Sequence, residues 1–224
     1  MYDIWLGDQK EYVTVSLIGD QLFKGTIFDS GSDIIVLFNG ENFIYIPVSH
    51  IEYIVADTPD TEFAEPSDSP IIPLIDNKKN LTFESILKEA KGINQEICII
   101  GKKYLYGTIL EVMEDYLVFD SPIYKEIYIP IKHIKWLIPY TSNERPYGLT
   151  ETEFSWKQAK KEFEANFQQQ LAVLLNKLIV LNMGEKTHHI GKVKSINGKM
   201  LELITAKEKR TYVNIEHIQT IHCV

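Results

Sequence analysis

Cysteine is scarce in this chain of 224 residues, which contains two, Cys98 and Cys223. Two cysteines are too few for a disulfide framework or for a zinc site built on thiolates. Cys98 stands in the apolar run 97–100, where we expect it to be a small buried hydrophobic residue. The residues around Cys223 do not mark its thiol as activated. The sequence therefore offers no cysteine chemistry on which a function could rest.

Long apolar runs and an excess of basic residues are also missing. The longest apolar runs, such as 34–38, have the length of a strand, whereas spanning a bilayer takes roughly 18–20 residues. The amino terminus has neither a basic region nor a long apolar stretch, so we expect a cytosolic protein without a signal peptide or a membrane partner. With 31 acidic and 23 basic residues, the formal net charge is −8, which opposes unassisted binding of nucleic acid.

Motifs that carry catalysis are absent as well. The sequence contains no glycine-rich phosphate loop, nucleophile elbow or paired-carboxylate motif. We therefore expect a protein that is not an enzyme and that uses no cofactor and no metal. Its apolar content of 45%, with 24% charged residues, is nevertheless typical of a packed globular protein.

One sequence segment occurs three times in similar form, as residues 43–54, 126–137 and 210–221. In each occurrence a tyrosine precedes a histidine by five residues, and a glycine precedes that histidine by 25 or 26 residues. The signature residues are Gly25, Tyr45, Pro47 and His50, then Gly107, Tyr128, Pro130 and His133, and finally Gly191, Tyr212, Asn214 and His217. Agreement at this many positions indicates a unit that has been triplicated.

The first copy of the unit has the pattern of five short strands. Apolar residues alternate or cluster in segments that turn residues separate, which predicts strands at 12–17, 22–28, 33–38, 43–46 and 51–55. Gly25 predicts a bulge or bend in the second strand. Pro47 ends the fourth strand because proline has no backbone donor, and a short turn through His50 leads into the fifth. The later copies keep this order.

Helices and linkers separate the copies. Residues 82–91 predict a helix that stops at Gly92. Thr150 and Glu153 have the spacing of a capping box, and apolar residues at helical spacing follow to Asn176, which predicts a helix of roughly 20–25 residues. Residues 3–10 leave room for a short helix at most. We expect a first repeat at 1–56, an acidic, proline-rich linker at 57–80, a helix and second repeat at 81–140, a linker at 141–150, and a long helix with the third repeat at 151–224.

Five short strands cannot bury both faces as an open sheet, so we expect each copy to bend into a small barrel. The order of a helix, four strands, a tight turn and a fifth strand resembles the Sm-like barrel, and an OB or SH3-like barrel is the alternative. The sequence thus predicts a mainly β protein with helices, composed of three tandem five-stranded Sm-like small β-barrels, each preceded by a helix. Because domains this small bury little core, we expect the copies to pack on one another or on identical chains.

The repeated histidines allow two interpretations. Three equivalent barrels could place His50, His133 and His217 about a pseudo-threefold axis as a zinc site. Alternatively, each histidine caps backbone groups at its own turn, and we favour this structural role because it explains the repetition without a shared site. The repeated tyrosines are likewise interpreted as packing residues rather than as platforms on which nucleic-acid bases stack.

The third copy is locally basic. Its candidate anion-binding patch consists of Lys192, Lys194, Lys199, Lys207, Lys209 and Arg210. This is where an anionic ligand would be expected to dock, although a solvated surface explains the same residues, and we favour that explanation.

The signature itself resembles a known family. The segments 45–51, 128–134 and 212–218 share a Tyr-(Ile/Val)-x-(Ile/Val)-x-His-Ile pattern that is similar to the repeat region of the Bacillus spore-coat protein B family. This resemblance implies a structural protein of the outer spore coat, assembled in the mother cell without catalysis. RNA-binding Sm-like proteins carry an Asp-x-x-x-Asn pattern in strand three and an Arg-Gly pair near strand four. The third strands here read differently and no Arg-Gly pair occurs, so RNA binding is not implied.

We therefore expect a structural or interaction protein that is a spore-coat or sporulation-associated component. Its expected partners are other coat proteins or copies of itself, and its expected location is the mother-cell cytoplasm or the spore coat. Two alternatives stay open. One is a module that binds nucleic acid or another anionic ligand through the third copy, and the other is a regulator or inhibitor that binds another protein through exposed edges.

Overall fold

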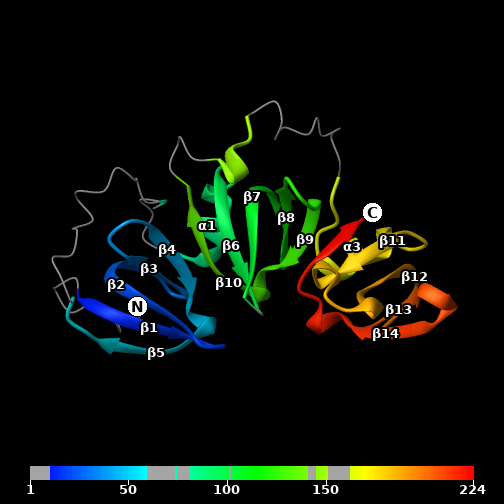
Figure 1. The fold of residues 1–224 in the computed structure, drawn as a ribbon, viewed down its shortest axis with the longest axis horizontal. Helices are drawn as coiled ribbons and strands as arrows, with labels where there is room; N and C mark the ends of the chain where they lie inside the picture. The colour runs from blue at the N-terminus through cyan, green and yellow to red at the C-terminus, as the bar shows by residue number, and fades with distance from the viewer. Residues whose placement is uncertain (1–10, 60–73, 75–80, 101, 141–144, 151–161) are drawn as a thin grey trace. The chain divides into compact units, whose positions relative to one another are not determined.

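The computed structural model describes residues 11–59, 74, 81–100, 102–140, 145–150 and 162–224 (Figure 1). Within these residues, fifteen strands, each hydrogen-bonded to its neighbours, form one antiparallel sheet, and two short helices accompany them. The predicted mainly β class is confirmed. The expected closed barrels are not found: among the described residues, the strands form a continuous open sheet.

Each copy has the same order of four strands, a 3-10 turn and a fifth strand. The first copy comprises β1 Tyr12–Leu17, β2 Gln21–Ser30, β3 Ile34–Phe38, β4 Phe43–Pro47, the turn η1 Val48–His50 and β5 Ile51–Ala56. The second comprises β6 Asn94–Ile99, β7 Lys103–Val112, β8 Tyr116–Ser121, β9 Lys125–Pro130, η3 Ile131–His133 and β10 Ile134–Pro139. The third comprises β11 Leu178–Leu181, β12 Ile190–Asn197, β13 Met200–Thr205, β14 Arg210–Asn214, η8 Ile215–His217 and β15 Ile221–Cys223.

The chain divides into two compact units whose boundary passes through the second copy. The first unit takes residues 1–106 and 134–146, and the second takes 107–133 and 147–224. The first unit holds β5-β1-β2-β3-β4-β10-β6, in order of hydrogen-bonded neighbours. The second holds the later part of β7 followed by β8-β9-β15-β11-β12-β13-β14. The division into three repeat domains stays a prediction, because these units do not follow the copies.

In both units, the fourth strand of one copy pairs with the fifth strand of the next copy. Tyr45 of β4 lies opposite Leu137 of β10, and Tyr128 of β9 lies opposite Ile221 of β15. The hydrogen-bonding edge of the fourth strand is therefore occupied by the following copy. This strand addition is the physical reason why these copies extend one sheet instead of closing separate barrels.

Each unit has a core to which two copies contribute. In the first unit, Cys98 and Trp136 of the second copy join buried residues of the first copy such as Val15. In the second unit, Tyr116 and Tyr128 of the second copy join residues of the third copy, which include Leu171, Val193 and Leu203. Sharing a core between copies compensates for the small core that one short repeat can bury alone.

The first helix was predicted correctly, and the second was not. Helix α1 spans Phe83–Glu89, and the Thr82 hydroxyl accepts a hydrogen bond from the Ser85 backbone N–H as its N-cap. The long helix up to Asn176 is wrong over its described part, because residues 162–166 are not helical and α3 spans only Phe167–Val173. Residues 3–10, 151–161 and most of the acidic linker lie outside the described residues.

Side-chain and backbone contacts explain where α3 begins. The Asn166 side chain accepts from the backbone N–H of Gln169, and an Asp115 carboxylate oxygen accepts from the backbone N–H of Phe167 at 2.7 Å. Just before this cap, the Tyr116 hydroxyl donates to the Glu164 carbonyl at 2.7 Å. These bonds hold 164–166 against the start of β8 and stop the helix from extending backwards.

The signature glycines mark close approaches between the second and third strands of each copy. A Cβ atom would lie 2.1 Å from the Phe38 carbonyl oxygen at Gly25, and 1.9 Å from the Asp120 carbonyl oxygen at Gly107. At Gly191 the equivalent distance is 2.9 Å. The expected bulge does occur in each second strand, but the register shifts after residues 27, 109 and 193, beyond the glycine. The glycine is needed for backbone proximity rather than for the bulge itself.

Candidate functional site

The three signature turns have the same conformation, although the residue before the turn is proline in two copies and asparagine in the third. Each is a single 3-10 turn ending in the signature histidine. Pro47 precedes the first turn with φ −61°, the value that its ring imposes. Asn214 takes the equivalent position in the third copy, where its side-chain oxygen accepts from the Glu216 backbone N–H at 3.0 Å. A rigid ring and a side-chain cap therefore produce the same corner.

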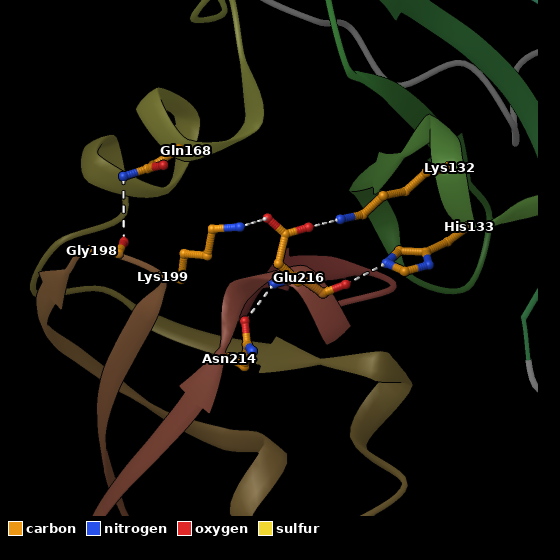
Figure 2. Close-up of polar contacts among 7 residues, drawn as sticks. All are labelled: Lys132, His133, Gln168, Gly198, Lys199, Asn214 and Glu216. Carbon is orange, nitrogen blue, oxygen red and sulfur yellow. Dashed lines mark hydrogen bonds and ion pairs between the residues drawn. The ribbon is translucent and has the colours of Figure 1, made fainter.

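His133 connects the turn of the second copy with the turn of the third. Its Nε2 lies 3.1 Å from the Glu216 carbonyl oxygen (Figure 2). With the hydrogen on Nε2, the ring donates to this carbonyl. The contact bridges two copies, which the sequence interpretation, limited to each histidine's own turn, did not include.

Glu216 makes a second connection between the same turns. Its carboxylate accepts from the ammonium group of Lys132 and lies 3.2 Å from Lys199 Nζ (Figure 2). The hydrogen bond from Lys132, followed by that from Lys199, lowers the pKa of Glu216 to about 2. All three side chains are about half exposed or more, so solvent screens the pairs and they add specificity more than stability. Lys132 and Glu216 occupy the same signature position in successive copies, one residue before the histidine.

The signature tyrosine and histidine are buried in the first two copies and exposed in the third. Tyr45 and Tyr128 are 0% and 1% exposed, whereas Tyr212 is 56% exposed. His50 and His133 are buried, whereas His217 is exposed. The third copy therefore presents to solvent a tyrosine and a histidine that the other two copies bury.

The fifth strands differ in exposure in the opposite direction, since that of the first copy is exposed and that of the second is buried. Strand β10 of the second copy is almost entirely buried. The equivalent strand of the first copy, β5, is mostly exposed: Tyr53 is 49% exposed, while its counterpart Trp136 is 3% exposed. Within the described part of the chain, the outer edges of β5 and β14 have no neighbouring strand. We call these the β5 edge and the β14 edge.

The candidate anion-binding residues lie on the surface of the third copy, and two of them pair with acidic residues. Lys192 and Lys194 are exposed positions of β12 that alternate with buried ones. Lys207 lies within the turn η7 Ala206–Glu208, Lys209 follows this turn, and Arg210 begins β14. Arg210 Nε lies 3.8 Å from a carboxylate oxygen of Glu202, and Lys199 pairs with Glu216. Acidic residues of the same copy thus partly neutralise the patch.

Metal and thiol chemistry find no support in the described residues. Within those ranges, no group of three or more His, Cys, Asp or Glu side chains is placed to hold a metal ion. Cys98 is buried, and burial raises the pKa of its thiol, which disfavours the reactive thiolate. Among the helices that the structure describes, none combines the length and the apolar character required to cross a membrane.

Lys135 is a contact residue that sequence reasoning missed. It is 2% exposed, and its ammonium group donates to the Ile18 carbonyl and to Gln21 Oε1, each at 2.5 Å. Burial lowers the pKa of Lys135. The hydrogen bonds fix the second copy to the first, but the equivalent positions are Glu52 and Gln219, so the repeat gave no signal. By contrast, the opposite charges of Lys132 and Glu216 at one repeat position were visible in the sequence.

Two comparisons with known proteins relate the chain to one group. It is 31% identical over 216 residues to the uncharacterized protein YwrJ of Bacillus subtilis (strain 168), and the alignment covers 94% of each chain. Residues 166–221 match the family model described as the YwrJ third domain. The matched segment runs from the N-cap of α3 into β15 and so corresponds to the third copy.

Proposed function

The chain belongs to the YwrJ family, and we propose that it is a non-enzymatic structural protein that assembles with other proteins through the edges of its sheet. The observation that carries this proposal is the strand addition between copies. The fourth strand of one copy is completed by the fifth strand of the next at both described junctions. Among the strands that the structure describes, two edges are left over, and exposed edges are natural sites for adding another strand.

We also propose that each copy is an Sm-like unit in an open form. In each copy a 3-10 turn lies between the fourth and the fifth strand, and in the first copy the fifth strand pairs with the first. This matches the order expected for an Sm-like repeat. Occupation of the fourth strand by the next copy accounts for the open sheet, and an OB or SH3-like unit is the alternative.

The proposed place of action is the spore coat or the mother-cell cytoplasm. Support comes from the likeness of the segments 45–51, 128–134 and 212–218 to the repeats of the Bacillus spore-coat protein B family. The relative in Bacillus subtilis belongs to the genus of that coat family. The two alternative functions, binding of an anionic ligand and regulation of another protein, receive less support. Pairing of Lys199 and Arg210 with acidic residues weakens the case for an anionic ligand, and a regulator would use the same edges.

Expression timing and location test this proposal. We expect a fluorescent fusion of the full chain, expressed from its own promoter in a sporulating Bacillus host, to accumulate in the mother cell and then around the spore. Fluorescent protein expressed alone from the same promoter is the control and should stay diffuse. Signal restricted to vegetative cells, or turnover of a substrate by the purified protein, would contradict the proposal. Capture of one cytosolic enzyme in place of coat proteins would favour the regulator.

A further inference from the structure

The two described junctions between copies have the same register. Tyr128 lies opposite Ile221, and Ile127 lies opposite His222. Tyr45 lies opposite Leu137 in the other junction. In each case the signature tyrosine faces the residue four positions after the next copy's signature histidine. The junction is therefore a repeated contact with a defined alignment.

The β14 and β5 edges are the two halves of this contact. The β14 edge carries the signature tyrosine Tyr212 and histidine His217, which are exposed although their counterparts in the earlier copies are buried. The β5 edge carries Tyr53 and Val55, which are both about half exposed, while the equivalent strand β10 is covered by β4. Each edge thus exposes residues whose counterparts are covered by a neighbouring strand at the internal junctions.

We propose that a second copy of this chain adds its β5 edge to the β14 edge of the first copy, in the register of the internal junctions. This inference rests on the proposed function and names the partner for it. In that register Tyr212 lies opposite Ile54 of the partner subunit, and Thr211 lies opposite Val55 of the partner subunit. His217 takes the place of His133 and donates to the carbonyl of Ser49 of the partner subunit.

Charge complementarity favours a second copy over an unrelated strand. Continuing the antiparallel register by two residues from Thr211 brings Lys209 opposite Asp57 of the partner subunit, with Arg210 beside it. Asp57 is ionised at neutral pH, because hydrogen bonds from Thr14, the Thr58 backbone and Lys24 lower its pKa to about 2. Asp57 already pairs with Lys24 Nζ at 3.2 Å, and Arg210 lies near Glu202, so Lys209 supplies the additional positive charge that meets the acidic end of β5.

The contact joins two different surfaces, so it is heterologous. Each added chain offers a new β14 edge, and growth continues until a ring closes or a filament forms. Such growth is consistent with a structural protein. A symmetric pairing of two β14 edges would end at a dimer and would place Tyr212 near its own counterpart instead.

Cysteine cross-linking between two separately purified proteins tests this register. In a Cys223→Ser background, one protein carries Thr211→Cys and the other, with a tag of different mass, carries Val55→Cys. Mixing them under copper phenanthroline oxidation should give a covalent heterodimer. The matched control mixes Tyr212→Cys with Val55→Cys. These positions are one step out of register, and their side chains leave opposite faces of the sheet.

We expect the in-register pair to cross-link about tenfold faster than the control, since a disulfide requires Cβ atoms roughly 4 Å apart. Equal rates, or homodimers of the Thr211→Cys protein as the main product, would overturn the inference. So would the absence of any covalent product from variants whose circular dichroism matches the parent. If the fusion reaches the spore but the register fails, only this junction is wrong. If the register holds but the fusion stays away from spores, only the coat function is wrong.

Discussion

Asp120 is a buried carboxyl group of β8, and its replacement by asparagine is expected to stabilise the second unit at neutral pH. The residue is 7% exposed, and Glu126 lies opposite it on β9. Burial, followed by the charge of Glu126, raises the pKa of Asp120 from 3.8 to about 6. Above this pKa the folded protein holds an unfavourable buried carboxylate that the unfolded chain exposes to water.

The direction of the pH dependence follows from proton linkage. As the pH falls from 7 through 6, folded Asp120 binds a proton that the unfolded chain does not, so the free energy of unfolding rises. Below about pH 4 both states are protonated, and the contribution of Asp120 stays constant. Since one pKa unit corresponds to about 1.4 kcal/mol, the two pKa values together imply at most about 3 kcal/mol at pH 7.

Urea unfolding followed by circular dichroism between pH 7.5 and 4.5 measures this effect. We expect Asp120→Asn to raise the free energy of unfolding at pH 7.5 by about 1–3 kcal/mol, with the difference from the parent protein shrinking as the pH falls. Glu114→Gln removes an exposed acid in the bend before β8 and should change stability by less than about 0.5 kcal/mol. A destabilised Asp120→Asn protein, or a difference that does not depend on pH, would refute the reasoning.

Three further pairs of variants test the packing of two strands, the junction between copies and the third turn by thermal unfolding. Gly107→Ala places a methyl group against the backbone of β8 and should cost several kcal/mol of stability or prevent folding. Gly198→Ala, with open space around it, should cost only about 1 kcal/mol. Similar losses in the two variants would contradict the close approach at Gly107. His133→Ala removes a bridge between copies and should destabilise the chain by about 1–2 kcal/mol, while His217→Ala should leave monomer stability unchanged and weaken self-association. Asn214→Ala removes the side-chain cap of the third turn and should cost about 1 kcal/mol of stability. Asn214→Ser should recover part of this loss, because serine can also cap the turn. Identical melting temperatures of the two variants would argue against the cap.

The strands of the first copy could be predicted closely, because their signals are local. Alternating apolar residues and turn residues placed the first strand at 12–17, where β1 is found, and the other four strands end within two residues of the expected positions. The turn before each fifth strand was also expected from Pro47 and His50. Such features depend on residues close together in the sequence.

The junctions between copies could not be predicted in the same way. Whether the fourth strand closes its own copy or pairs with the next is decided by residues far apart, such as Tyr45 and Leu137. The helix wrongly predicted before α3 has a similar cause. The local apolar spacing favours a helix, but Asp115 and Tyr116 form hydrogen bonds with the backbone at 164–167. The same signature tyrosine is buried at position 45 and exposed at position 212, because burial depends on the neighbouring copy.

The mass of the protein in solution tests the central claim, assembly through complementary edges, most directly. Light scattering during gel filtration should show the parent chain well above its monomer mass of 25.9 kDa. A variant with both Thr211→Lys and Val55→Lys places like charges opposite each other and should be a monomer, and Thr211→Lys with Val55→Glu should restore assembly. A parent chain that stays monomeric at every concentration, or a lysine pair that assembles like the parent, would contradict the account.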